Sequence, residues 1–129
     1  MQRDMELTRK ILFKIEETVS NVVEYNLKIE GYSMEQIAYH CSLLYDSNLI
    51  NDYGGQYAGG ELYSFGVGRL TWEGHEFLDK IRSDTVWNRT KEVITKRGLP
   101  MAIDVVKSIS TTIISAMVEG AVKGLNQQS

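Results

Sequence analysis

The stretch from Arg69 to Arg82 constrains the fold of this chain more than any other. It begins as the end of a strand, which Leu70 closes, and then takes up a helical pattern. Thr71 is placed to cap that helix, because its hydroxyl can accept a hydrogen bond from a free N–H of the first turn. The apolar residues that follow recur at helical spacing and form one face: Gly74, Phe77, Leu78 and Ile81. The stretch therefore predicts a strand-to-helix junction that is anchored in the core, with Trp72 as a further anchor.

Three other helices are predicted, over residues 4–19, 33–47 and 101–125, and residues up to 97 have a helical pattern after Arg82. Asp4 can cap the first, and Ser33 with Gln36 forms a capping box at the start of the second. Ser83 and Asp84 offer a cap at which a helix restarts or continues. The inward residues of the second helix are expected to be Ile37, Cys41, Leu44 and Tyr45. Asn48 can take the left-handed position that ends the second helix, and Gly98-Leu99-Pro100 is a firm break before the last one.

A glycine-rich segment separates the second and third helices. Residues 54–68 contain six glycines and few charges, and they follow a strand-like run from Leu49 to Tyr53. Residues 62–70 have the composition of a returning strand, with a bulge expected near Gly66. We therefore expect a β-hairpin with a long tip. Residues 20–32 are compatible with helix or strand, and Leu27 to Glu30 alternates like a short strand.

This order of elements predicts an α+β fold, mostly α. Helix, capped helix, glycine-rich hairpin and helix is the order of a winged helix-turn-helix domain with a two- or three-stranded β-wing. Residues 1–97 would form this winged-helix-like domain. Residues 98–129 would form an additional C-terminal helix that packs on this domain or mediates dimerisation.

Several motifs resemble those of a small uncharacterised family of phage- and prophage-associated bacterial proteins. They are Met1 to Leu12, Ile37-Ala-Tyr-His40 followed by Leu43-Leu44, and Leu70 to Arg82 continuing into Ser83-Asp84-Thr85-Val86-Trp87. The resemblance covers most of residues 1–97. It implies a winged-helix-like fold and a mobile-genetic-element setting, and it implies no particular activity.

Composition limits the cellular setting. Cys41 is the only cysteine, so no intrachain disulfide can form, and a reducing cytoplasm is expected. The N-terminus lacks the apolar core of a signal peptide. The apolar stretch from Ser108 to Val118, bounded by Lys107 and Glu119, is too short to span a bilayer, so no membrane partner is expected.

The last helix, from Met101 to Leu125, is β-branched and poor in charge. Such a helix must be buried against another surface. A row of small residues, Ala116, Gly120 and Gly124, permits close helix approach. Packing within the chain and self-association are both open, and a homodimer through this helix is expected.

The sequence favours neither a metal site nor an enzyme. His40, Cys41 and His75 do not have the spacing of a zinc site. His75 lies one turn from Asp79, close to Arg82, but no nucleophile accompanies the pair, and a polar cluster that pins the helix is the better interpretation. The glycine-rich segment lacks the pattern of a phosphate-binding loop. We therefore expect no catalytic residue, no metal and no cofactor.

Binding is the expected function, and two partners remain open. The outward row of helix 33–47 is predicted to be Gln36, Tyr39, His40, Leu43 and Ser47, with Tyr57 and Arg69 on the wing. These residues could contact duplex DNA in a transcriptional regulator, although the helix contains no Lys or Arg and the net charge of the chain is -3. The alternative is a winged-helix adaptor or inhibitor that binds a host or phage protein through its aromatic residues and does not bind DNA.

Overall fold

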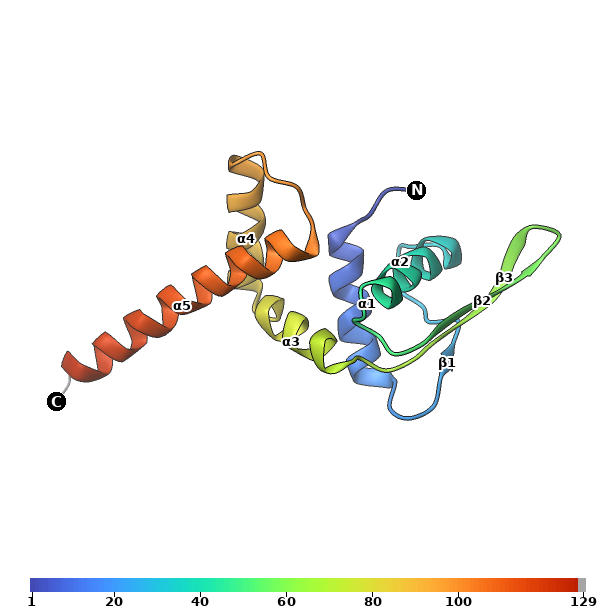
Figure 1. Ribbon diagram of the computed structural model, residues 1–129, viewed down its shortest axis with the longest axis horizontal. Coiled ribbons are helices and arrows are strands. Elements are labelled where there is room, and N and C mark those ends of the chain that lie inside the picture. The colour runs from blue at the N-terminus through green and yellow to red at the C-terminus, as the bar shows by residue number, and fades with distance from the viewer. Residues whose placement is uncertain (128–129) are drawn as a thin grey trace. The chain divides into compact units, whose positions relative to one another are not determined.

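The computed structural model describes residues 1–127 as an α+β fold that is mostly helical. Figure 1 shows the elements in chain order: α1 (Met5–Thr18), β1 (Glu24–Tyr25), α2 (Met34–Asp46), β2 (Tyr53–Ala58), β3 (Glu61–Val67), α3 (Trp72–Ile81), α4 (Asp84–Lys96) and α5 (Ile103–Gln127). The predicted fold class, α+β with further helices after the hairpin, is confirmed at this level. Residues 128 and 129, the end of the predicted 98–129 segment, lie outside the described residues.

The chain forms two compact units, which are described separately. Unit 1 is Met1–Leu78 and holds α1, α2, the sheet and most of α3. Unit 2 begins at Asp79 and holds the end of α3 together with α4 and α5. The division falls inside α3, and α4 and α5 pack against each other in unit 2.

The predicted helix caps are confirmed. The Asp4 carboxylate accepts hydrogen bonds from the N–H groups of Glu6 and Leu7 at the start of α1. At α2 the Ser33 hydroxyl accepts from the Gln36 N–H at 3.1 Å, and the Gln36 side chain accepts from the Ser33 N–H at 2.9 Å. These reciprocal bonds satisfy donors that a helix start otherwise leaves free.

The end of α2 is also confirmed. Asn48 has a φ of 61° in the left-handed region, and its N–H donates to the Tyr45 carbonyl. The Leu49 N–H donates back to the Leu44 carbonyl at 2.9 Å, which closes the helix and buries Leu49. Tyr45 is 47% exposed, so its predicted inward position is wrong. It lies in the last turn of α2, where the following residues are exposed as well.

The three strands form one antiparallel sheet with the order β1-β3-β2. The hairpin between β2 and β3 turns through Gly59 and Gly60, whose φ values of 60° and 82° suit glycine. The tip is therefore short, and the predicted long tip is wrong. The register shifts between Gln56 and Tyr57, so that Tyr63 is an extra residue in β3. The bulge thus lies nearer the tip than the predicted position at Gly66.

The ambiguous segment before α2 contains a strand and no helix. Glu24 and Tyr25 form β1 and pair with Val67 and Gly66 of β3. The strand therefore lies before the alternating residues 27–30. The N–H of Asn26 donates to the Phe65 carbonyl, and the Asn26 side chain accepts from the Phe65 N–H, which continues the pairing by one residue.

The start of α3 is fixed against the end of α2. The Thr71 hydroxyl donates to the Asn48 carbonyl at 2.6 Å and accepts from the Gly74 N–H at 3.0 Å, so its predicted capping role is confirmed. Gly74 has no space for a side chain, because a Cβ atom there would lie 2.1 Å from the Leu49 carbonyl oxygen. Trp72 is 76% exposed, and its predicted role as a core anchor is wrong. At about 100° per residue it lies on the side of α3 opposite to the buried residues.

In unit 2, the chain turns between α4 and α5 at Gly98, whose φ is 64°. This confirms the predicted break. The N-terminal half of α5 carries the buried residues Val106 and Ser110, whereas its C-terminal half extends beyond α4 and is exposed (Figure 1).

Candidate functional site

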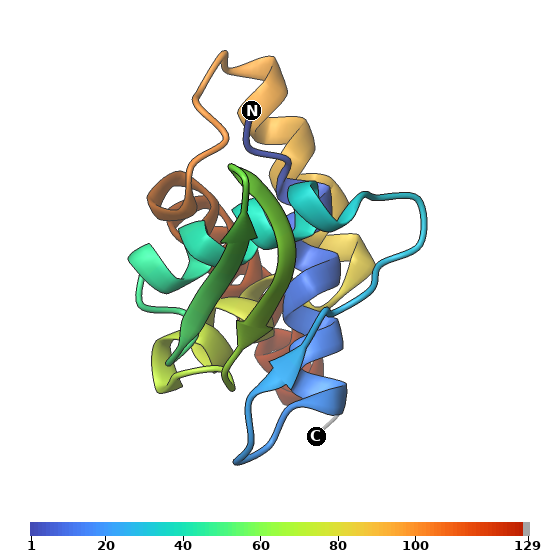
Figure 2. The same cartoon turned by 90° about the vertical axis from the view of Figure 1, so that its right-hand side faces the viewer.

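A groove lies between α2 and the β2–β3 hairpin in unit 1. Figure 2 shows the hairpin crossing in front of α2, and both strands contact that helix. The cavity between them has a volume of about 370 Å³. Its polar and aromatic lining comes from Glu35, Tyr39, Ser42, Tyr53, Tyr57 and Glu61. We call this cavity the α2–hairpin groove.

Two tyrosines of β2 form one wall of the groove. Tyr53 and Tyr57 lie on the same face of the strand, because side chains alternate along it, and both line the groove. Gly55 lies between them, and a Cβ atom there would come within 3.1 Å of both Tyr53 Oη and Tyr57 Cε2. The glycine thus lets the two rings close over the strand. Burial raises the pKa of Tyr53 to about 12, and the neighbouring Tyr57 and Cys41 side chains act in the same direction.

The groove carries negative charge and no positive charge. Glu35 lies in the first turn of α2 and Glu61 begins β3. No Lys or Arg lines the cavity, and α2 contains none. Unit 1 as a whole has six Lys and Arg residues against twelve Asp and Glu residues, a net charge of -6. The surface formed by α2 and the hairpin is therefore acidic and aromatic.

The structure brings two of the predicted site residues together. Tyr39 of α2 and Tyr57 of β2, which is 63% exposed, line the same groove. Gln36 uses its side chain in the capping box, and Leu43 is half-buried. Ser47 is exposed beyond the end of α2.

His40 is not part of an outward row, and this prediction is wrong. The residue is 2% exposed, and both of its ring nitrogens are hydrogen-bonded. Nε2 accepts from the Asp4 N–H at 2.8 Å, and Nδ1 lies 2.7 Å from the Gln36 carbonyl oxygen. Because an N–H donates to Nε2, the hydrogen of the neutral ring lies on Nδ1. A histidine can be buried here because the backbone satisfies both nitrogens.

Two members of the groove were harder to predict. The sequence predicts Tyr53 only as the end of a strand-like run, without a link to α2, and nothing in it singles out Glu61. The available signals were strand alternation, which puts Tyr53 and Tyr57 on one face, and the Gly59-Gly60 pair, which sets the hairpin register. The position of α2 against that face depends on tertiary packing.

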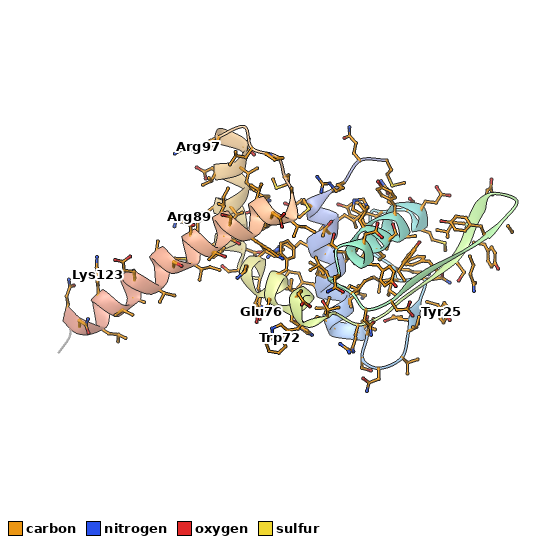
Figure 3. The ribbon with its side chains drawn as sticks, viewed as in Figure 1. Tyr25, Trp72, Glu76, Arg89, Arg97 and Lys123 are labelled. Atoms are coloured by element: carbon orange, nitrogen blue, oxygen red, sulfur yellow. The ribbon has the colours of Figure 1, made fainter. Side chains whose placement is uncertain are left out.

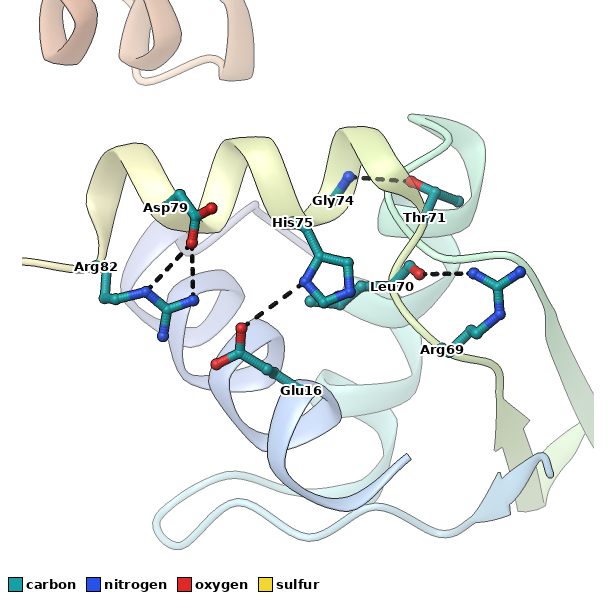
Figure 4. A network of polar contacts seen from close by, with 8 residues as sticks. All are labelled: Glu16, Arg69, Leu70, Thr71, Gly74, His75, Asp79 and Arg82. Atoms are coloured by element: carbon teal, nitrogen blue, oxygen red, sulfur yellow. Dashed lines mark hydrogen bonds and ion pairs between the residues drawn. The ribbon is translucent and has the colours of Figure 1, made fainter. Parts of the chain in front are cut away.

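The polar residues of α3 make structural contacts (Figure 4). His75 Nδ1 lies 3.8 Å from a Glu16 carboxylate oxygen, which links α3 to α1 in unit 1. Asp79 accepts a hydrogen bond from Arg82 at 2.9 Å. Arg69, the other predicted wing residue, is exposed and donates from Nη1 to the Leu70 carbonyl at 3.1 Å. Within residues 1–127 no group of three or more His, Cys, Asp or Glu side chains is arranged to hold a metal ion.

A second cavity, of about 500 Å³, lies beside the loop between β1 and α2. It is lined by backbone and by mostly apolar side chains such as Leu27, Ile29 and Met34. None of the predicted site residues lines it. The α2–hairpin groove is therefore the better candidate site.

The long helix α5 is the other exposed feature. Within the described residues it is the one helix whose length and composition would allow it to cross a membrane, and 11% of its most apolar window is buried. The stretch from Ser108 to Val118 is by itself too short to span a bilayer, but the whole of α5, from Ile103 to Gln127, is long and apolar enough. Large apolar side chains remain exposed at Met117, Val118, Val122 and Leu125.

Fold and groove together define a small α+β protein with an acidic, aromatic surface beside a β-hairpin. The chain belongs to the family described as "Hypothetical protein (DUF2513)", whose pattern matches residues 2–100. It is 38% identical over 120 residues to a Haemophilus influenzae (strain ATCC 51907 / DSM 11121 / KW20 / Rd) protein described as "Uncharacterized protein", covering 91% of this chain and 98% of that one. No solved structure matches the chain.

Proposed function

We propose that unit 1 is a winged-helix-like module that binds a protein partner through the α2–hairpin groove. The observation that carries this proposal is the gathering of Tyr39, Tyr53 and Tyr57 in one cavity with no cationic residue in its lining. Tyrosine is enriched at the energetic centres of protein interfaces. The proposal assigns no catalytic activity and no cofactor to the protein. It places the protein in the cytoplasm and in a phage or prophage setting.

The order of elements supports a winged-helix-like unit. In unit 1, α1, β1, α2 and the β2–β3 hairpin follow one another, and β1 pairs with β3. In such a unit α2 would take the place of the recognition helix and the hairpin that of the wing. A helix-turn-helix needs another helix just before α2, and residues 26–33 contain none. The helix that precedes the recognition helix in a helix-turn-helix, and that crosses the DNA backbone, is thus absent from residues 26–33.

The charge of unit 1 favours a protein over DNA. Affinity for DNA depends on Lys and Arg side chains that neutralise phosphates. The surface of α2 and the hairpin offers Glu35 and Glu61 instead, in a unit with a net charge of -6. His40, which was predicted to face outward and so to be able to contact DNA, is buried.

A DNA-binding regulator is the second candidate, and the charge of unit 2 favours it. From Asp79 onward the sequence has eight Lys and Arg against five Asp and Glu residues, a net charge of +3. Figure 3 shows Arg89 and Arg97 projecting from α4. Lys96 of the same helix is paired with Glu92 at 2.7 Å. A DNA contact would therefore involve α4 and not the α2–hairpin groove.

Affinity capture with matched variants tests the first candidate. The immobilised full chain is compared with Tyr57→Ala and with Tyr63→Ala, an exposed tyrosine of the same hairpin that does not line the groove. Retained bacterial proteins are quantified by mass spectrometry. We expect a protein that the wild type and Tyr63→Ala retain and that Tyr57→Ala loses. Equal retention of every protein by both variants would reject the groove as the binding surface.

Fluorescence anisotropy with labelled duplex DNA tests the second candidate. Binding that falls steeply between 50 mM and 200 mM salt, and that weakens in Arg89→Gln/Arg97→Gln, would support a DNA role for α4. We expect no such binding by the full chain at either salt concentration. A salt-dependent, arginine-dependent signal would favour the DNA regulator over the protein-binding module.

We also propose that the protein is a homodimer through α5. Burial of the exposed side chains of its C-terminal half, including Val118 and Val122, would remove apolar surface from water. A membrane is the competing occupant of the same surface. The Glu119–Lys123 pair, 3.6 Å apart and 70% exposed on both sides, lies within this half and supports an aqueous setting.

A further inference from the structure

We infer that the α2–hairpin groove accepts a cationic side chain, an arginine or lysine of a protein partner, between its tyrosine rings and its two glutamates. This inference rests on the proposed function and specifies the chemistry of the partner. Three observations support it: the negative charge of the groove, the arrangement of its tyrosine rings, and the absence of ion-pair partners for its two glutamates among the described residues.

The negative charge in the groove is uncompensated. Neither Glu35 nor Glu61 has an ion-pair partner in the part of the chain that the structure describes. They come from different elements, the first turn of α2 and the start of β3, yet they line the same cavity. A cation in this cavity would therefore be attracted by both carboxylates. An anionic partner would be repelled by the same pair and by the net charge of the unit.

The aromatic part of the groove suits the same cation. A Lys or Arg group within about 6 Å of an aromatic centroid is attracted by the electron-rich face of the ring. This chain already uses such pairs elsewhere: Lys10 lies 5.4 Å from the centroid of Tyr32, and Arg9 lies 4.9 Å from that of Phe13. Among residues 1–127, no cation lies over Tyr39, Tyr53 or Tyr57.

The size of the groove fits a side chain and not a helix. Its volume of about 370 Å³ is at the small end of the range for ligand pockets. Gly55 lies between Tyr53 and Tyr57 in β2, and a Cβ atom there would press on both tyrosines. An extended segment with one inserted Arg or Lys side chain is the occupant that matches this volume and this charge.

Peptide binding to the full chain tests the inference. The probes are fluorescein-labelled seven-residue peptides in which arginine, lysine or glutamate alternates with glycine, and anisotropy reports binding at 50 mM salt. We expect the arginine and lysine peptides to bind and the glutamate peptide not to bind. Equal affinity for the arginine and glutamate peptides, or no binding of either cationic peptide, would overturn the inference.

Matched variants separate the groove from the general charge of unit 1. We expect Glu35→Gln/Glu61→Gln to weaken binding of the arginine peptide by about five-fold or more. Glu17→Gln/Glu76→Gln removes the same charge at exposed positions outside the groove and should leave affinity within about two-fold. If both double variants lose affinity equally, the peptide is held by net charge alone and the inference fails.

A second pair of variants tests the rings. Gly55→Ala should disturb the two tyrosines and weaken binding, whereas Gly54→Ala, whose Cβ atom meets nothing within 4 Å, should not. Circular dichroism confirms that both variants are folded. Equal affinity of the two variants would overturn the role of the tyrosine pair.

The outcome also distinguishes this inference from the proposed function. Capture of a protein partner that Tyr57→Ala abolishes, together with no preference for cationic peptides, would reject the inference and leave the protein-binding module standing. Capture that does not depend on the groove would reject both.

Discussion

The backbone N–H of Asp4 donates a hydrogen bond to Nε2 of His40 across 2.8 Å and 36 positions of sequence. Asp4 is the N-cap of α1, and His40 belongs to α2. The same imidazole ring reaches the Gln36 carbonyl through Nδ1. One buried side chain thus connects the beginning of α1 to the middle of α2, and it does so as a neutral ring with a defined tautomer.

Replacing His40 should destabilise unit 1. In His40→Ala the part-buried Asp4 N–H loses its partner, and leaving a buried group unsatisfied costs up to about 1–3 kcal/mol. We expect the free energy of unfolding, measured by urea denaturation, to fall by about that amount. Tyr45→Ala, in the same helix but exposed, should change it by no more than about 0.5 kcal/mol. Equal losses in the two variants would argue against the hydrogen bond as the cause.

Gly74 should tolerate no side chain. Gly74→Ala places a Cβ atom 2.1 Å from the Leu49 carbonyl oxygen, which is backbone and cannot rotate away. We expect a loss of about 1–3 kcal/mol in thermal or urea denaturation, despite the better helix propensity of alanine. Gly120→Ala is the control, because a Cβ atom there meets nothing within 4 Å. It should leave stability unchanged or raise it by up to about 1 kcal/mol.

Stability should decrease at alkaline pH. Burial raises the pKa of Cys41 from 9.0 to about 12, and burial with the neighbouring Tyr57 raises that of Tyr53 from 10.0 to about 12. Both groups bind their protons more tightly in the folded state. The stability they contribute is complete below pH 9 and is lost as the pH rises from 9 toward 12. Urea denaturation should therefore give similar free energies of unfolding at pH 7 and pH 9, and a lower one at pH 10.5. Cys41→Ala should make this dependence shallower, and an equally steep dependence would exclude a contribution from the thiol.

The Cys41 thiol should be unreactive in the folded protein. It is completely buried, and its raised pKa keeps it protonated near neutral pH, whereas the thiolate is the reactive form. With Ellman's reagent at pH 8 we expect no labelling in native buffer and one thiol per chain in 6 M urea. Rapid labelling in native buffer would show that the core around α2 opens readily.

Oligomeric state tests the role of α5. We expect the full chain to be a dimer by light scattering and Val118→Gln/Val122→Gln to be a monomer with unchanged helix content. Truncation after Gly98 is a poorer test, because it removes the helix that packs against α4. If the wild type is a monomer in buffer and floats with phosphatidylglycerol vesicles, the dimer proposal is rejected. Contact of α5 with a membrane would then be the better explanation of its exposed apolar side chains.

Local hydrogen bonding explains which features were predictable. Caps at Asp4, Ser33, Thr71 and Ser83, and the left-handed Asn48, depend on groups within a few residues. Which side chains point into the core and which point into solvent was less predictable. His40 was predicted in the outward row of helix 33–47, whereas a backbone N–H from α1 makes its burial possible.

The sequence by itself determined where helices begin and end, that six glycines mark a hairpin, and that the chain folds as α+β. These features follow from hydrogen bonds and periodicities within a few residues of one another. Only the tertiary structure decided the division inside α3, the exposure of Trp72 and the groove that joins Tyr39 to Tyr57. Those outcomes depend on which faces of distant elements pack together, because burial is a property of the assembled surfaces and not of any single segment.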